Sequence, residues 1–103
     1  IGSGVAIPHV RPDRLRNPVL AYAHSTEGIE WDAPDAEPVH HVFFLVSASG
    51  AEDLHVQILA QIARAMARPE NRHRLALASD RHLLFTTLQD ALSEDRRLPP
   101  ATA

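Results

Sequence analysis

The spacing of apolar positions changes along the chain and divides it into a strand-like first half and a helical second half. In the first half, apolar residues form short runs or alternate with polar ones, as in β-strands. Three such segments are predicted as strands: 4–8, 19–25 and 40–47. The last contains the unbroken apolar run Val42–Val46, which favours a central strand buried on both faces. The turn-rich stretch before it favours a small hairpin arm around Ile29 and Trp31.

In the second half, apolar residues recur every three or four positions, which is the period of an amphipathic helix. Leu54, Ile58 and Ile62 begin such a stripe, and Leu88 and Leu92 lie in another. Breaks in the pattern separate three predicted helices: 51–67, 69–77 and 80–93. Strands followed by helices predict an α/β or α+β fold in which helices cover a sheet.

Local signals at the helix starts agree with these boundaries. Ser49 followed three residues later by Glu52 is a capping-box pattern for the first helix. Pro69 suits the first turn of the second helix, and Ser79 or Asp80 can cap the third.

With 103 residues the chain forms one domain at most, expected over 1–95, followed by a disordered tail at 96–103. Because it begins without Met and inside an apolar motif, we expect it to be part of a longer protein.

Composition narrows the classes of function. The absence of cysteine excludes a disulfide framework, a thiolate zinc site and a cysteine nucleophile. The net charge is −3, and the ten cations, all arginine, are scattered from Arg11 to Arg97, so no basic stripe favours nucleic acid or an anionic membrane. The run Val42–Val46 is the longest apolar stretch and is too short to span a bilayer. No signal peptide is visible.

Most of the seven histidines carry no ligand or catalytic pattern. The neighbours His40 and His41 face opposite ways on a strand and are interpreted as structural. His24, His73 and His82 lack ligand-like spacing and are expected on solvated faces. Because no helix carries an H-x3-H or HExxH pair, a metal site is not favoured.

His9 and His55 differ from the others. His9 directly follows Pro8 at the expected end of a strand, where binding sites of α/β sheets tend to open. His55 falls in the first turns of a helix, near free N–H groups and a dipole that lowers the pKa of an imidazole, so a neutral hydrogen-bonding role is expected. Together they would suit a phosphoryl group. The alternative is two unrelated histidines, one capping and one on the surface.

The stretch "GVAIPHVR" resembles the G-x-A-I-P-H signature of IIA domains of the bacterial sugar phosphotransferase system, in the fructose/mannitol class that includes the nitrogen-regulatory IIA protein. The stretch "GIEWDAPDAEPVHHVFFLVSASGAEDLHVQILAQIARAM" is similar to the segment and helix that follow in that family. The order and spacing hold from Gly4 to about Leu92. The resemblance implies a three-layer α/β/α sandwich on a mixed sheet, of which this chain has three strands and three helices and lacks the family's N-terminal β-α-α segment.

The resemblance also implies roles for residues. His9 would be the phosphorylated histidine and His55 the second active-site histidine, which orients the phosphoryl group. The helix start around Ala51–Leu54, including Asp53 and Leu54, would donate backbone hydrogen bonds to its oxygens. No metal or organic cofactor is needed. The location would be cytoplasmic.

The implied partners are a histidine-phosphorylated carrier of the HPr type and either a IIB domain or a regulated transporter. Two departures leave an alternative open, a regulatory domain that binds proteins without carrying phosphate. The family's upstream active-site arginine has no counterpart, since Arg11 does not match it. Val10 stands where a small residue is usual, and its β-branched side chain is expected either to crowd an incoming partner or to narrow the backbone choices beside the phosphate. A third alternative, a metal-dependent hydrolase that uses His9 and His55, is disfavoured by the lack of ligand spacing.

Overall fold

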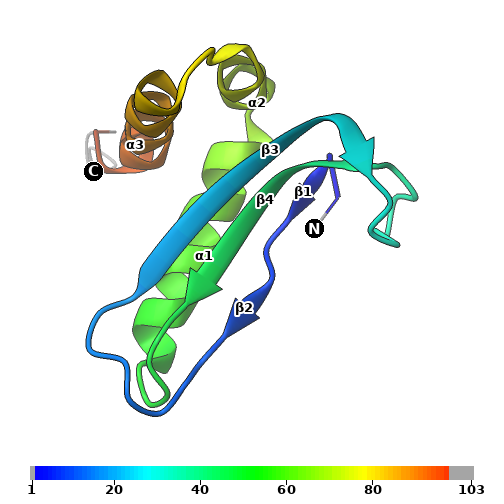
Figure 1. Ribbon diagram of the computed structural model, residues 1–103. Helices are drawn as coiled ribbons and strands as arrows, with labels where there is room; N and C mark the ends of the chain where they lie inside the picture. The colour runs from blue at the N-terminus through cyan, green and yellow to red at the C-terminus, as the bar shows by residue number, and fades with distance from the viewer. Residues whose placement is uncertain (1, 98–103) are drawn as a thin grey trace, which may run out of the picture. The chain divides into compact units, whose positions relative to one another are not determined.

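The computed structural model describes residues 2–97 and divides into two compact units, residues 1–59 and 60–103. The first unit holds four strands and the start of the first helix (Figure 1). The strands are β1 (Val5–Ala6), β2 (His9–Val10), β3 (Val19–Ile29) and β4 (Val39–Val46). β4 lies at the centre of one sheet, with β1 and β2 parallel to it on one side and β3 antiparallel to it on the other. The expected α/β class with a mixed sheet is confirmed.

The single strand predicted at 4–8 is instead two short strands, and His9 lies within the second rather than after a strand end. β1 pairs with β4 at His41 and Val42, and pairing resumes where His9 lies opposite Leu45. Pro8 explains the break, because it has no N–H to donate to the ladder. Its carbonyl still accepts a hydrogen bond from the Leu45 N–H at 3.0 Å.

The predicted hairpin arm is the closing part of a longer β3–β4 hairpin. β3 continues past the expected end at residue 25 to Ile29, which pairs with Val39 after an irregular stretch. Gly28 lies in that stretch with φ of +91°, and a Cβ there would lie 2.8 Å from the Cβ of Pro38, so only glycine fits. Trp31 belongs to the connecting loop rather than to a strand.

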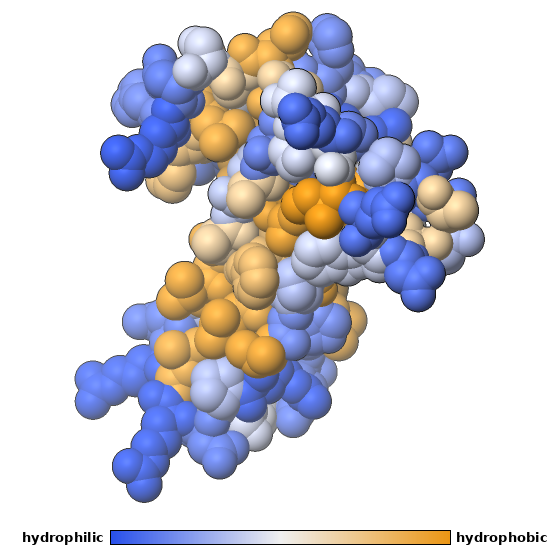
Figure 2. All heavy atoms as spheres, turned by 45° about the vertical axis from the view of Figure 1, so that its right-hand side comes forward, coloured by the Kyte–Doolittle hydropathy of each residue, from blue (hydrophilic) through white to orange (hydrophobic). Residues whose placement is uncertain are grey.

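The two faces of β4 are buried unequally. Phe43 and Leu45 are fully buried on one face, and Ser47 continues that face beyond the strand. On the other face Val42 is buried, whereas Phe44 is 54% exposed opposite Ala21. The prediction of burial on both faces is therefore wrong at Phe44. Figure 2 shows hydrophobic surface between hydrophilic side chains on its visible face.

The helices are α1 (Glu52–Ala67), α2 (Pro69–Leu77) and α3 (Arg81–Arg97), close to the predicted ranges except that α3 runs four residues further. Pro69 and Asp80 act as predicted: Pro69 lies in the first turn of α2, and the Asp80 carboxylate accepts the Leu83 N–H at 2.8 Å. The Ser49–Glu52 capping box is wrong in register, because the Ala51 carbonyl accepts the first helical bond, from the His55 N–H. A tight turn joining Ala48 to Ala51 moves the helix start past Ser49.

The second unit holds the end of α1 with α2 and α3. The buried side chains among its described residues are Ile62, Ala65, Met66, Asn71, Leu75, Thr87 and Ala91. Asn71 is fully buried, and its amide donates to the Ala65 carbonyl at 2.9 Å. Of the predicted tail at 96–103, residues 96 and 97 extend α3 and the rest lie outside the described residues. The single domain over 1–95 stays a prediction.

Candidate active site

Two histidines 46 positions apart in sequence lie side by side in the first unit. β2, the end of β4 and the start of α1 gather at one end of the sheet (Figure 1). There the rings of His9 and His55 have their centroids 5.1 Å apart, with the ring planes tilted by 59°. The structure thus brings together the two residues that the sequence singled out, at a separation that lets both rings contact one small oxyanion. Their chemical roles stay a prediction.

One hydrogen bond fixes the tautomer of His9. Its Nδ1 lies 2.8 Å from the backbone carbonyl oxygen of Ile7. A carbonyl can only accept, so Nδ1 must carry the proton and donate it. The neutral ring then has its lone pair on Nε2. Because His9 is exposed on β2, this nitrogen belongs to a side chain that a partner can reach.

His55 is buried, being 7% exposed, and contacts a serine that the sequence analysis did not find. Its Nδ1 lies 2.5 Å from the hydroxyl oxygen of Ser47, which is fully buried just after β4. This bond leaves Nε2 of His55 for another partner. The signal available in the sequence was the period of the strand, since Ser47 continues the inward face of Phe43 and Leu45.

The surroundings of His55 favour its neutral form. Burial, then the charge of His9, then the charge of Arg11 hold its pKa below the ordinary value of 6.5. The expected direction is right, but burial rather than the helix dipole is the leading cause. The Arg11 guanidinium also lies 3.8 Å from the carboxylate of Glu52, the first residue of α1, close enough to His55 to affect its pKa.

Val10 lies on the other face of β2 from the histidine pair, and its expected effect on an incoming partner stays a prediction. It is paired with Val46, one position along the strand from the His9–Leu45 pair. Successive side chains of a strand point to opposite faces, so Val10 projects away from the face that carries His9 and His55. Its side chain is 61% exposed there.

Asp53 and Leu54, expected to bind phosphate, lie in the first turn of α1. Backbone N–H groups of a first turn have no acceptor within the helix and point outward from its start. Both side chains are exposed, and the Asp53 carboxylate would repel an anion, so any contribution would come from their N–H groups. Their role in binding stays a prediction.

The other histidines are held by structural contacts or lie on the surface. His41 is buried and its Nδ1 lies 2.6 Å from the Tyr22 hydroxyl, while His40 Nδ1 donates to the Ser25 carbonyl at 2.8 Å, as a structural interpretation requires. His24 is half-buried with its ring 5.2 Å from that of His41, so the solvated face expected for it is wrong. His73 and His82 are exposed.

Among the side chains that the structure describes, no group of three or more His, Asp or Glu is arranged to hold a metal ion. Within residues 2–97, no helix has the length and apolar character needed to cross a membrane.

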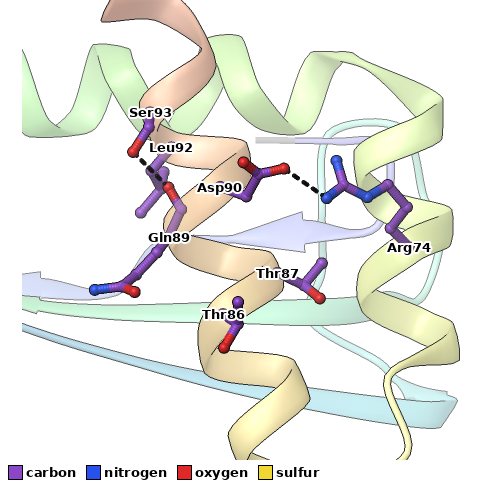
Figure 3. Close-up of a pocket in the computed structure, with 7 residues that line it drawn as sticks. All are labelled: Arg74, Thr86, Thr87, Gln89, Asp90, Leu92 and Ser93. Carbon is purple, nitrogen blue, oxygen red and sulfur yellow. Dashed lines mark hydrogen bonds and ion pairs between the residues drawn. The ribbon is translucent and has the colours of Figure 1, made fainter.

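Two hollows lie apart from the histidine pair. One, of about 730 Å³, is formed by the β3–β4 loop around Trp31. The other, of about 630 Å³, lies between α2 and α3 in the second unit (Figure 3). There the Arg74 guanidinium lies 2.7 Å from the Asp90 carboxylate, so its charge is already neutralised. Neither hollow contains a histidine.

The lowered pKa of His55 predicts that folding weakens in mild acid. The unfolded chain binds a proton near pH 6.5, whereas folded His55 resists it, so the stabilisation is complete above pH 6.5 and is lost as pH falls through the lowered folded-state pKa. In urea unfolding across this window, the free energy of unfolding of the wild type should decrease as the pH is lowered. The decrease should be less steep in His55→Gln. Parallel slopes in the two proteins would contradict the prediction.

The family model described as "Phosphoenolpyruvate-dependent sugar phosphotransferase system, EIIA 2" matches residues 1–91. A fructose-specific EIIA component of Haloferax volcanii is 39% identical over 95 residues, covering 91% of this chain and 58% of that protein. A nitrogen regulatory protein of Pseudomonas aeruginosa is 34% identical over 89 residues, covering 86% and 58%.

Among solved structures, the nitrogen regulatory protein IIA-Ntr of Neisseria meningitidis matches with a TM-score of 0.78 and 28% identity. The match covers 88% of this chain and 60% of that one. The chain thus spans about three fifths of the length of each of these relatives.

Proposed function

The chain belongs to the EIIA type 2 family of the phosphoenolpyruvate-dependent sugar phosphotransferase system, and on this premise we propose that it carries a phosphoryl group on His9. The observation that carries the proposal is the pairing of the His9 and His55 rings at 5.1 Å. One ring is exposed and presents a free nitrogen, and the other is buried and neutral. That combination suits a nucleophile with a fixed hydrogen-bond donor beside it.

In the proposed transfer, the lone pair of His9 Nε2 attacks the phosphorus of a phosphohistidine on a carrier protein of the HPr type. An N–P bond forms at His9, the carrier's N–P bond breaks in line with it, and the electron pair of the broken bond returns to the carrier's ring nitrogen. The proton on His9 Nδ1 stays in its bond to the Ile7 carbonyl. No bond outside the phosphoryl group is rearranged, so the protein contributes positioning and charge stabilisation, without a metal or organic cofactor.

The groups around His9 match the charge that the phosphoryl group brings. With Nδ1 of His55 bonded to Ser47, its Nε2 is the ring nitrogen left to face the phosphoryl group. Arg11 also acts on His55 electrostatically, although its guanidinium lies 3.8 Å from the Glu52 carboxylate, which offsets part of its charge. The free N–H groups of Asp53 and Leu54 lie in the first turn of α1.

The tautomer of His9 makes a specific prediction about the product. Because Nδ1 is occupied by the Ile7 carbonyl, the phosphoryl group is expected on Nε2 only. Nitrogen-15 NMR of the phosphorylated protein, labelled at histidine, distinguishes the two isomers by which ring nitrogen couples to phosphorus. Coupling to Nδ1 would show that the bond to Ile7 breaks on phosphorylation and would contradict the assignment.

The destination of the phosphoryl group has two candidates, because the relatives include both a fructose-specific component and a nitrogen regulatory protein. Either a IIB domain takes it onward toward a sugar, or phosphorylated His9 acts as a signal to a regulated protein such as a transporter. A cytoplasmic location is part of both versions. Incubation of the full-length protein with a phosphorylated HPr-type carrier, followed by a IIB domain, separates them by whether the label moves on.

The alternative of a regulatory domain that never carries phosphate rests on two departures from the family, at Val10 and at the upstream arginine. Val10 projects to the face of the strand opposite His9, so it does not stand between His9 and His55. The family's upstream arginine remains without a counterpart in this chain, although Arg11 supplies a cation nearby. Repeated failure of the full-length protein to accept phosphate from an HPr-type carrier would favour the alternative.

A further inference from the structure

Ser47 connects the two strands and the helix that build the histidine pair. Its hydroxyl lies 2.5 Å from His55 Nδ1 on α1, and it is fully buried. Its backbone N–H donates to the carbonyl of Val10, the residue after His9, at 3.1 Å. A single serine therefore touches the ring of one histidine and the backbone next to the other.

The direction of the Ser47–His55 hydrogen bond decides what His55 can do. A serine hydroxyl can donate or accept, and so can a neutral imidazole nitrogen. If Ser47 donates to Nδ1, the ring proton is on Nε2, which can then donate to an oxyanion. If Nδ1 donates to Ser47, Nε2 holds a lone pair that would repel phosphoryl oxygens. A protonated ring would carry a proton on both nitrogens and have no tautomers. Burial favours the neutral ring, so the position of its single proton matters.

We propose that Ser47 is a positioning residue that donates to His55 Nδ1 and thereby holds the ring proton on Nε2, directed at the phosphoryl group of His9. This inference rests on the proposed carrier function and adds a residue to it. Ser47 touches no reacting atom; it acts through His55. The partner bonded to one ring nitrogen of a functional histidine sets the tautomer and orientation of the other.

The first test reads the tautomer without any phosphate. Nitrogen-15 NMR of the unphosphorylated wild type should show the His55 proton on Nε2, and Ser47→Ala should shift the ring toward the Nδ1–H form. Ser49→Ala removes an exposed hydroxyl from the same loop and should leave the ring unchanged. A His55 proton found on Nδ1 in the wild type would overturn the proposal, and this result does not depend on whether the Ser47→Ala variant folds. If the variant does fold, an unchanged His55 tautomer would also overturn it.

The second test measures transfer of phosphate from an HPr-type carrier to His9. Loss of the partner behind a metal-bound histidine costs roughly ten- to a hundredfold in affinity or activity, and by the same logic we expect about tenfold for Ser47→Ala. Ser47→Thr keeps the hydroxyl and should recover most of the rate. Because Ser47 acts through His55, the double variant with His55→Ala should be no slower than His55→Ala alone. Additive losses, or a Ser47→Ala rate equal to wild type, would overturn the proposal.

The two tests separate this inference from the carrier function. A wild type that takes no phosphate, while Ser47→Ala shifts the tautomer, would refute the carrier function and with it the phosphoryl role of the serine. A wild type that takes phosphate at His9, with the same tautomer in both proteins, would refute only the role of Ser47.

Discussion

Replacing His9 with alanine is expected to abolish phosphorylation completely, because the substitution removes the attacking nitrogen itself. The ring has one free lone pair, on Nε2, and the neighbouring His55 is buried, so it is not a ready substitute for an incoming carrier. Incubation with a phosphorylated HPr-type carrier should leave the variant without the acid-labile, base-stable label typical of phosphohistidine. The wild type should acquire one label per chain.

The control for this variant is His73→Ala, which removes another exposed histidine, on α2. It should accept phosphate at the wild-type rate. Both substitutions change exposed side chains and should alter the free energy of unfolding by only about 0.5 kcal/mol or less. Acid-labile phosphate that still appears on the His9→Ala protein would show that the acceptor is elsewhere.

Features set by a few neighbouring residues were predictable from the sequence. Pro69 and Asp80 mark the starts of α2 and α3 through their own backbone and side-chain chemistry, which needs no distant partner. The apolar run around Phe43 likewise predicts the central strand. The helix start near Ser49 was misjudged because a tight turn, rather than the side chain, determines which carbonyl accepts the first helical bond.

Features that depend on distant partners were not predictable. The break at Pro8 matters only because β4 lies alongside and requires a donor at that position. His24 became half-buried because its register places it opposite His41, which strand spacing alone does not reveal. For Ser47, the strand period predicts only that the side chain faces inward. Its contact with His55 arises from the placement of α1 against the sheet.

The histidine pair itself lies between these cases. The sequence indicated His9 and His55 separately, one by the preceding proline and one by its place in a helix, and the family resemblance joined them. The structure adds what neither could supply: the Ile7 carbonyl that fixes the His9 tautomer, and the serine behind His55. Each of these contacts is made to Nδ1 of its ring. It therefore determines what the other nitrogen, Nε2, can do.

Replacing His55 with alanine is expected to slow phosphorylation of His9 by roughly a hundred- to a thousandfold without abolishing it, which is the usual cost of one oriented donor to a developing oxyanion. The nucleophile remains, because the His9–Ile7 hydrogen bond does not involve His55. The loss should exceed that of Ser47→Ala, since the donor is deleted rather than left in the wrong tautomer. Single-turnover transfer from a phosphorylated HPr-type carrier measures both rates.

His55→Gln is the matched variant, because its side-chain amide can accept from or donate to Ser47 and present an N–H near the position of Nε2. It should recover part of the rate that His55→Ala loses. Alanine also leaves the buried Ser47 hydroxyl without its ring partner, at a cost of about 1–3 kcal/mol in stability, so rates are compared at a temperature where each variant is folded. A His55→Ala protein that accepts phosphate as fast as wild type would remove His55 from the mechanism and leave its contact with His9 as packing alone.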